Sequence, residues 1–183
     1  MSRIAYIGLG SNLDSPAGTP AETVASGARS LTAIGEIVAR SSLYRTAPVG
    51  YEDQPSFVNA VVALRTDENP EEVLQYLLAI ERSFGRDRAA GIAKGPRTLD
   101  LDLLLMGDLI YQSPTLMVPH PELQHRRFVL APLAEIAPEM VHPVLRKTVR
   151  ELLAALPDNE AYVGGANSRT AVRRLGRMGA HRV

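Results

Sequence analysis

Hydrophobic and polar residues alternate most regularly over residues 98–106. Leucine occupies every second position from 99 to 105, and Asp100 and Asp102 lie between the leucines. In a strand, this alternation places the leucines on one face and the two carboxylates on the other. A slip of one residue in the pairing would bury both carboxylates, so the pattern predicts a strand with a strongly specified register. The predicted inward-facing residues are Leu99, Leu101, Leu103 and Leu105.

Asp100 and Asp102 share one predicted face, about 6.5–7 Å apart along the backbone. Their oxygens can converge on one hard cation or on two adjacent ones, as sites of phosphoryl transfer require. Arg97 precedes them, and its planar guanidinium matches a phosphate group. Taken alone, an Asp-X-Asp pair on a strand favours a solvated outer face over a metal site, so the neighbouring residues must decide.

The remaining hydrophobic pattern predicts further strands and four helices. Strands are expected over residues 4–10, 37–45, 56–66 and 109–111. Helices are expected over residues 20–34, 70–84, 126–136 and 149–156. Three of them begin at capping signatures, in which Thr19, Asn69 and Thr148 are each followed three residues later by glutamate. The loop 46–55 is longer than a tight hairpin needs, and such loops often carry function.

The order of the main elements is strand, helix, strand, strand, helix, strand. This order is typical of the split β-α-β, ferredoxin-like arrangement. The predicted fold class is therefore α+β: a ferredoxin-like sandwich with an antiparallel sheet, helices packed on one face, the other face free for a ligand, and additional C-terminal elements.

Composition narrows the functional classes. The 183 residues are 45% hydrophobic and 22% charged, which is typical of one globular domain. Cysteine is absent, which excludes a disulfide framework and a thiolate zinc site, and the four histidines are too scattered for a metal motif. The N-terminus has no secretory leader pattern, and no apolar run approaches membrane-spanning length. We expect a cytoplasmic protein with no membrane partner.

Charge is balanced overall, with twenty basic and twenty acidic residues, but it is unevenly distributed. Residues 1–160 carry a net charge of −5, and residues 161–183 carry +5 from five arginines. We interpret 1–160 as the functional domain and 161–183 as a basic, flexible C-terminal tail. A solvated tail is favoured over a contact with nucleic acid or another partner.

Several ordered motifs resemble one known family. They are Ile7-Gly8-Leu9-Gly10-Ser11-Asn12, Ser42-Leu43-Tyr44-Arg45-Thr46, Asp53-Gln54-Pro55-Ser56-Phe57-Val58-Asn59-Ala60, Gly95-Pro96-Arg97-Thr98-Leu99-Asp100-Leu101-Asp102, and Val118-Pro119-His120 through Arg126, Phe128 and Glu135-Ile136-Ala137-Pro138-Glu139. Together they cover about residues 3–145. The pattern is similar to the 6-hydroxymethyl-7,8-dihydropterin pyrophosphokinases of folate biosynthesis.

The resemblance implies that ATP donates a diphosphate group to the pterin hydroxymethyl oxygen and that AMP leaves. It implies that Asp100 and Asp102 bind two Mg²⁺ ions and act in catalysis with Arg86 and Arg97. The implied ATP-binding residues are Glu81, Arg86, Arg88, Arg97, His120 and Arg126. Without the resemblance, His120 is more simply read as a histidine satisfied by the backbone of a proline-rich turn.

The resemblance also implies a pterin site. Phe57 and Phe128 match two aromatics that sandwich the ring, although core packing is the usual role of phenylalanine. Asn59 offers a donor and an acceptor to the heterocycle edge. The implied pterin-binding residues are Thr46, Val49, Gly50, Phe57, Asn59 and Phe128.

Two positions depart from the family pattern. Lys94 stands where many members carry an aromatic residue over the pterin, and Ala47 replaces a common proline. We expect the cationic loop 86–96 to be mobile in the free protein and to close over nucleotide and pterin together. We expect a monomer.

Two other functional classes compete with this interpretation. A non-catalytic RNA-binding module fits a ferredoxin-like sheet with a basic tail, but the sheet-face aromatics of an RNA-recognition motif are absent. Two carboxylates on the binding face would also repel a phosphate backbone, so we expect no nucleic-acid partner. A glycoside hydrolase lacks a suitably separated acid and base and an aromatic sugar cleft.

Overall fold

The computed structural model describes residues 1–47, 53–86, 89, 95–157 and 173–178. Its main sheet is antiparallel throughout, in the order β5-β1-β4-β3-β8, and β2 also pairs with β4. The strands are β1 (Arg3–Ser11), β2 (Glu36–Arg40), β3 (Ser42–Thr46), β4 (Phe57–Thr66), β5 (Asp100–Met106) and β8 (Arg173–Arg177). A separate two-stranded sheet joins β6 (Tyr111–Gln112) and β7 (Met117–Val118). These pairings confirm the predicted antiparallel α+β sandwich.

The helices are α1 (Pro20–Ser30), α2 (Pro70–Ser83), α3 (Arg127–Ile136) and α4 (Val149–Ala155), with short 3-10 turns at Leu31–Ala33 and Leu123–His125. The predicted capping boxes at Thr19, Asn69 and Thr148 are all present, which confirms the helix starts. No helix within these described ranges is long and apolar enough to cross a membrane.

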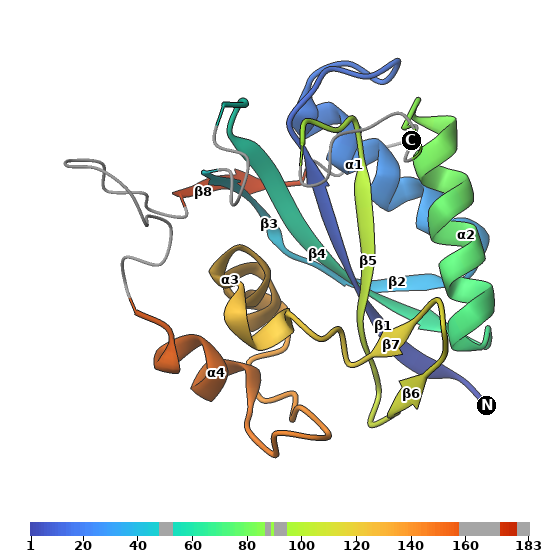
Figure 1. Cartoon of the computed structure of the whole chain (residues 1–183), viewed down its shortest axis with the longest axis vertical. Helices are drawn as coiled ribbons and strands as arrows, with labels where there is room; N and C mark the ends of the chain where they lie inside the picture. Colours follow the sequence, from blue (N-terminus) through green and yellow to red (C-terminus); the bar gives the residue numbers. More distant parts are fainter. Residues whose placement is uncertain (48–52, 87–88, 90–94, 158–172, 179–183) are drawn as a thin grey trace.

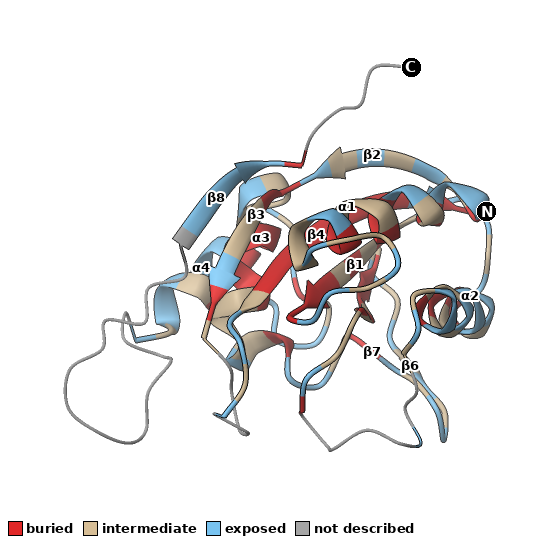
Figure 2. Ribbon diagram, turned by 90° about the horizontal axis from the view of Figure 1, so that it is seen from above, coloured by how far each residue is buried: buried red, intermediate tan, exposed pale blue. Residues whose placement is uncertain are grey.

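Helices cover both faces of the sheet (Figure 1). Helices α1 and α2 pack on one face over a large apolar cluster, whereas α3 and α4 pack on the other over a smaller one. The expectation of one free face is therefore wrong. β4 explains the difference, because its residues 58–64 are buried on both faces (Figure 2). A strand buried on both sides needs a layer on each.

The alternation predicted for β5 holds through Leu103 and then breaks. β5 bulges against β1, so that Ile7 pairs with Leu103 and Tyr6 pairs with Leu105. The bulge moves Leu105 into the cluster beneath α3, while Leu103 stays in the cluster beneath α1 and α2. One face for all four leucines is thus incorrect, because one extra residue in a strand inverts the alternation beyond it.

The strand predicted over residues 37–45 is two strands, β2 and β3, which pair with different halves of β4. They separate at Ser41, whose backbone N–H donates to Val61 O at 2.9 Å. The Ser41 hydroxyl oxygen accepts from Val61 N, also at 2.9 Å. The Ser41 side chain therefore accepts the hydrogen bond of a β4 backbone N–H between the end of β2 and the start of β3.

Part of the predicted tail is a strand. β8 pairs antiparallel with β3, and the pairing shifts between Leu43 and Tyr44. Gly176 lies opposite Leu43 with φ +117°, a conformation that favours glycine. Met178, which follows β8, is 7% exposed and belongs to the main core. Pairing with β8 gives hydrogen-bond partners to the backbone groups at the outer edge of β3. Burial of Met178 anchors the end of β8.

Candidate active site

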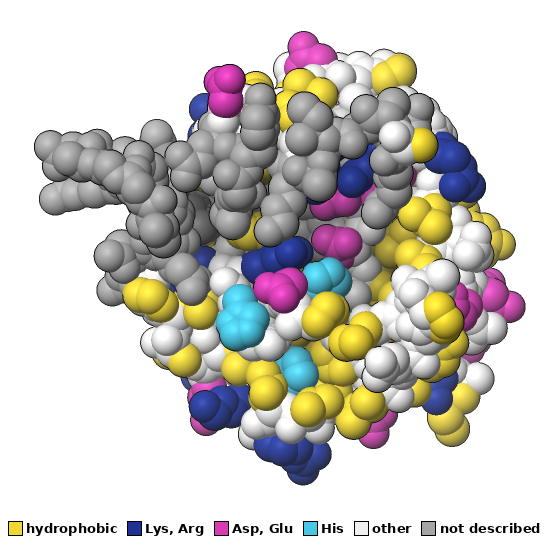
Figure 3. Space-filling model, viewed as in Figure 1, with side chains coloured by type: hydrophobic (Ala, Val, Ile, Leu, Met, Phe, Trp, Pro, Cys, Tyr) yellow, Lys and Arg dark blue, Asp and Glu magenta, His cyan; other side chains and the backbone are white. Residues whose placement is uncertain are grey.

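A pocket lies between the sheet and the start of α3. Eight of the residues predicted for the site line it: Thr46, Phe57, Asn59, Arg97, Asp100, Asp102, Arg126 and Phe128. These residues come from β3, β4, β5, the turn before β5, and α3 with its preceding turn. Acidic, basic and histidine side chains gather on the same face of the molecule (Figure 3). The fold thus brings together residues that lie more than eighty positions apart in sequence.

Two glycines of β1 leave space in this pocket because they have no side chains. Gly8 and Gly10 line it, two residues apart on one face of the strand. A Cβ at Gly10 would come within 2.8 Å of Asn59 Oδ1, and one at Gly8 within 3.4 Å of Leu104. The pocket therefore requires a missing side chain at Gly10. The sequence analysis did not assign either glycine to the site, although the Ile-Gly-Leu-Gly alternation is the signal for it.

Asp100 is held between two arginines. Arg86 Nη1 donates to Asp100 Oδ1, and Arg97 Nη1 donates to Asp100 Oδ2 at 3.2 Å. Arg86 also donates to Leu99 O at 2.9 Å. The side chains of Arg86, Arg97 and Asp100 are 14%, 19% and 22% exposed, so these charges are only partly screened by water. Arg97 lines the pocket, whereas Arg86 does not line it and holds Asp100 through an ion pair.

Glu81 lies behind this arrangement and does not line the pocket. Its side chain is 2% exposed, it accepts from the backbone N–H of Leu101 at 2.8 Å, and Arg86 Nη1 is 3.7 Å away. The structure thus places this predicted ATP-binding residue between α2 and β5. There it fixes the strand that carries both aspartates and compensates the charge of Arg86.

Phe57 and Phe128 stand on different elements of the pocket, β4 and α3. Each ring has an arginine over it: Arg97 Cζ is 5.1 Å from the centroid of Phe57, and Arg126 Cζ is 5.7 Å from that of Phe128. Both distances are within the range of cation–π attraction. Cationic groups and flat apolar surfaces therefore meet in one pocket.

Asn59 and Thr46, which both line the pocket, are hydrogen-bonded to each other. Asn59 Nδ2 donates to Thr46 Oγ1 at 2.6 Å, and both residues are buried. The Asn59 side chain is thereby oriented, and its Oδ1 points toward Gly10. An oriented amide is what recognition of a heterocycle edge needs.

His120 follows the cis Val118–Pro119 bond. Its backbone N–H donates to Leu104 O at 2.9 Å, and its Nδ1 accepts from Glu122 N at 3.2 Å. Burial, followed by the charge of Arg126, lowers the pKa of His120, while Glu122 and Asp100 act in the opposite direction. The imidazole is therefore neutral at neutral pH, with Nδ1 satisfied by the backbone.

Asn12 links the segment before β4 to the turn before β5, a role that the sequence analysis missed. Its Nδ2 donates to Gln54 Oε1 at 2.9 Å and to Pro55 O at 3.0 Å. Its Oδ1 accepts from the backbone N–H of Arg97 at 2.9 Å. Asn12 is 2% exposed. The Gly10-Ser11-Asn12 segment at the end of β1 is the sequence signal for this residue.

Some predicted site residues lie outside the described residues: Arg88, Val49 and Gly50. Lys94 and most of the loop 86–96, including its expected closure, lie outside them as well. Conversely, the pocket includes Glu122 and His125, which the sequence analysis did not assign.

Asp100 and Asp102 are two carboxylates of the pocket on one face of β5, an arrangement that suits a divalent cation. Within the described ranges, no group of three or more acidic, histidine or cysteine side chains could hold a metal ion. Mg²⁺, however, is usually held by one or two carboxylates together with substrate phosphates. The two aspartates fit that pattern, with oxygen ligands on one face of β5 beside two arginines.

Comparison with known proteins places the chain in one family. The family model described as 7,8-dihydro-6-hydroxymethylpterin-pyrophosphokinase (HPPK) matches residues 6–138. The 2-amino-4-hydroxy-6-hydroxymethyldihydropteridine pyrophosphokinase of Pseudomonas aeruginosa is 45% identical over 154 residues, 83% of this chain and 91% of that protein. The Haemophilus influenzae protein of the same name is 39% identical over 158 residues, 85% of this chain and 94% of that protein.

Longer proteins match as well. The Schizosaccharomyces pombe folic acid synthesis protein fol1 is 37% identical over 177 residues, 90% of this chain but 23% of that protein. A crystal structure of Plasmodium falciparum HPPK-DHPS has a TM-score of 0.66 and 18% identity, and covers 84% of this chain and 45% of that one. The chain thus spans less than half of these two proteins, and the structural likeness supports the fold. The match over residues 6–138 and the bacterial relatives show that this chain belongs to the 7,8-dihydro-6-hydroxymethylpterin-pyrophosphokinase family.

Proposed function

We infer that the protein transfers a diphosphate group from ATP to the hydroxymethyl group of 6-hydroxymethyl-7,8-dihydropterin, a step of folate synthesis. The observation that carries this function is one pocket in which an Asp100 carboxylate held by two arginines adjoins two aromatic rings. Family membership supports the same reaction.

The arginine side of the pocket suits the diphosphate group. In the reaction, the hydroxymethyl oxygen bonds to the β-phosphorus of ATP, and the bond from that phosphorus to the oxygen of AMP breaks. Negative charge develops on the phosphate oxygens, and cations that already contact the bound phosphates stabilise it as the reaction occurs. We assign this role to Arg86 and Arg97, which are already oriented by Asp100. Arg126, Arg88 and His120 are proposed to contact the nucleotide.

Asp100 and Asp102 are proposed to hold two Mg²⁺ ions together with the phosphates of ATP. Such ions, when bound, polarise the phosphoryl oxygens and neutralise their charge. Both oxygens of Asp100 accept from arginines in this structure, so arriving phosphates would take over those arginines and release the carboxylate. Asp100 would thus exchange cationic partners during substrate binding.

Phe57 and Phe128 are proposed to stack on the two faces of the pterin. Asn59, oriented by Thr46, would pair with the polar edge of the ring. The backbone groups of Val49 and Gly50 would complete that edge. A planar polar heterocycle needs this combination of stacking and edge hydrogen bonds. We further propose that the protein is monomeric, acts in the cytoplasm, and uses these two small molecules as its partners.

The identity of the nucleotide product tests this function. The purified full chain is incubated with ATP, Mg²⁺ and 6-hydroxymethyl-7,8-dihydropterin, and the nucleotides are separated by chromatography. We expect AMP in a 1:1 ratio to the pterin diphosphate, and no AMP when the pterin is omitted, because the reaction breaks one α–β phosphate bond per pterin. Release of ADP would contradict diphosphate transfer.

A further inference from the structure

The last turn of α3 is joined to β3 and β8 by one carboxylate. Glu135 accepts from Ser42 N at 3.1 Å, from Ser42 Oγ at 2.8 Å and from Tyr44 Oη at 2.6 Å. Arg174 of β8 donates from Nη2 to Glu135 at 3.2 Å and from Nε to Ser42 Oγ at 2.7 Å. We call Glu135, Ser42, Tyr44 and Arg174 the Glu135 network.

The protonation states keep this network intact near neutral pH. Burial alone would raise the pKa of Glu135, but the hydrogen bonds from Tyr44 and Ser42, together with Arg174, hold it below its usual value. Burial and the neighbouring Glu135 raise the pKa of Tyr44 to about 12. The carboxylate therefore stays charged and the phenol stays protonated, so every donor in the network keeps its acceptor.

The network joins α3, which carries Phe128, to β3, which pairs with the strand of Phe57. We call the part of the pocket lined by Phe57 and Phe128 the aromatic slot. Phe128 is in the first turn of α3, and Glu135 follows seven residues later, about 10 Å along the same helix. On the other side, β3 runs from Ser42 and Tyr44 to Thr46, which pairs with Phe57. Helix α3 has no side-chain hydrogen bond at its N-cap. Its position relative to β3 therefore depends on packing and on Glu135.

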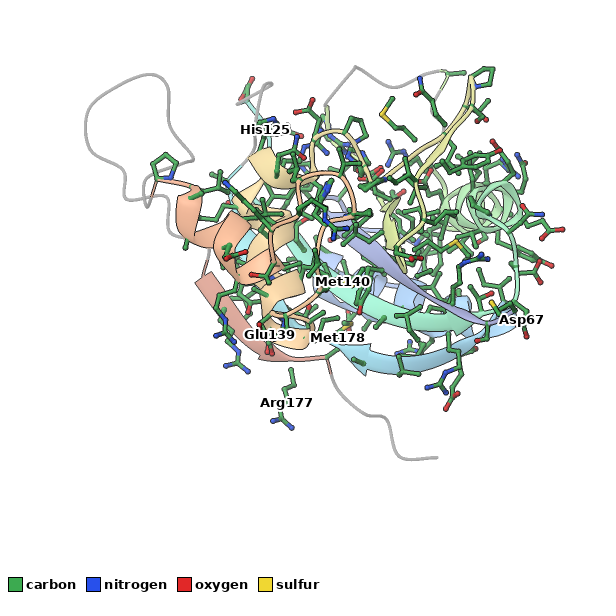
Figure 4. The ribbon with its side chains drawn as sticks, turned by 90° about the horizontal axis from the view of Figure 1, so that it is seen from below. Asp67, His125, Glu139, Met140, Arg177 and Met178 are labelled. Carbon is green, nitrogen blue, oxygen red and sulfur yellow. The ribbon has the colours of Figure 1, made fainter. Side chains whose placement is uncertain are left out.

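β8 supports this connection from the outside. Figure 4 shows Arg177 and Met178 at the end of β8, in the same region as Glu139 and Met140, which follow α3. Arg177 points away from the body of the protein, and it is exposed. Met178 is buried and fixes the end of the strand. Arg174 is thereby presented to Glu135 by a strand that is anchored at both its pairing edge and its end.

We propose that Glu135 and Arg174 are positioning residues that set the separation of Phe57 and Phe128, so that the C-terminal strand supports the pterin site. The inference rests on the proposed function, because the slot is taken to hold the pterin. An isolated half-exposed ion pair contributes little to stability. Here the effect is geometric. The Glu135 carboxylate accepts hydrogen bonds from β3 and β8, and it thereby holds both strands to α3, the helix that carries Phe128.

Steady-state kinetics of full-chain variants test the proposal. In Glu135→Gln and Arg174→Met, we expect KM for the pterin to rise about 3- to 10-fold, the range that one hydrogen bond of ordinary strength is worth. KM for ATP should stay within about twofold, since the arginines at Asp100 are untouched. Arg174→Lys should restore part of the pterin affinity. Arg177→Met, on the same strand, is the matched control and should behave as wild type.

A double variant separates positioning from general loosening. If Arg174 acts through Glu135, Arg174→Met should add little to Glu135→Gln, because coupled residues are not additive. Circular dichroism checks that each variant is folded at the assay temperature. An equal rise of KM for both substrates, or a full additive effect, would overturn the positioning role. A wild-type chain that releases no AMP would overturn the proposed function itself, which is a distinguishable result.

Discussion

The two faces of the main sheet use the same strands for different purposes. On the α1 and α2 face, β1 and β5 present Ile7, Leu9 and Leu101, which are at most 2% exposed. On the opposite face, the intervening positions are glycine on β1 and aspartate on β5, and these line the pocket. Alternation thus lets one register provide a closed core and an open polar site. Substitutions on the first face should change stability, and those on the second should change activity.

The largest expected effect is on the polar face. Asp102→Ala, and likewise Asp100→Ala, should lower kcat by about 10³-fold or more, since metal-assisted stabilisation of phosphoryl charge is worth several kcal/mol. The melting temperature of Asp102→Ala should stay close to wild type, because the leucine face is unchanged. Asp108→Ala, exposed beyond the end of the same strand, is the control. Turnover within a few-fold of wild type in either site variant would exclude the metal assignment.

The next largest effect is on the apolar face. Leu101 is 2% exposed in the core, and Leu101→Ala should lower the free energy of unfolding by about 2–5 kcal/mol. Urea titration measures this loss. In the folded variant, KM for both substrates should be unchanged. A raised KM for the pterin in fully folded Leu101→Ala would show that the two faces are not separable.

A smaller effect is expected at the aromatic wall. Phe128→Ala should weaken pterin binding by about 1–3 kcal/mol, by analogy with bases stacked on aromatic side chains. ATP binding should change less, since Arg86 and Arg97 lie on other elements and, of these three arginines, Arg126 alone loses a contact with the Phe128 ring. Titration calorimetry with each ligand separates the two effects. Equal losses for both ligands would mean that Phe128 is only a core residue.

The smallest expected effect concerns the loop between α3 and α4. His142 is 4% exposed, and its Nδ1 accepts from Val144 N and Leu145 N. Burial lowers the pKa of His142 below its usual 6.5. The unfolded chain therefore binds this proton more readily, so the contribution of His142 is complete above about pH 6.5 and is lost as pH falls below it.

His142→Asn tests this pH dependence, because Asn Oδ1 can accept in place of Nδ1 without titrating. Melting temperatures of both proteins are measured from pH 7.5 down to pH 5. We expect a shallower decrease in the variant than in wild type. Parallel curves would show that another group is responsible for the acid sensitivity.

Sequence patterns predicted the elements whose signals are local. The capping boxes at Thr19, Asn69 and Thr148 depend on side chains three residues apart, and the facing of Asp100 and Asp102 depends only on strand alternation. Features that depend on a partner strand were not predictable. The bulge that redirects Leu105 is a mismatch between β5 and β1, and the break at Ser41 appears only against β4.

The same distinction holds for the site. Asp100, Arg97 and Phe128 were assigned from motifs, and they line one pocket. Asn12 was missed because its partners lie 42, 43 and 85 residues away. Glu81 was assigned to ATP from the family resemblance, and its burial follows from the packing of α2 on β5. Residues that act through distant partners leave little trace in local sequence.

The late position of β8 has a consequence for synthesis on the ribosome. Arg174 lies 132 residues after Ser42, its partner on β3. At about 5–20 residues per second, roughly 7–26 seconds of translation separate the two residues. During that interval the outer edge of β3 has no β8 to pair with, and open strand edges recruit other chains. The growing chain therefore passes through a stage in which the edge beside the proposed pterin slot is open to pairing with another chain.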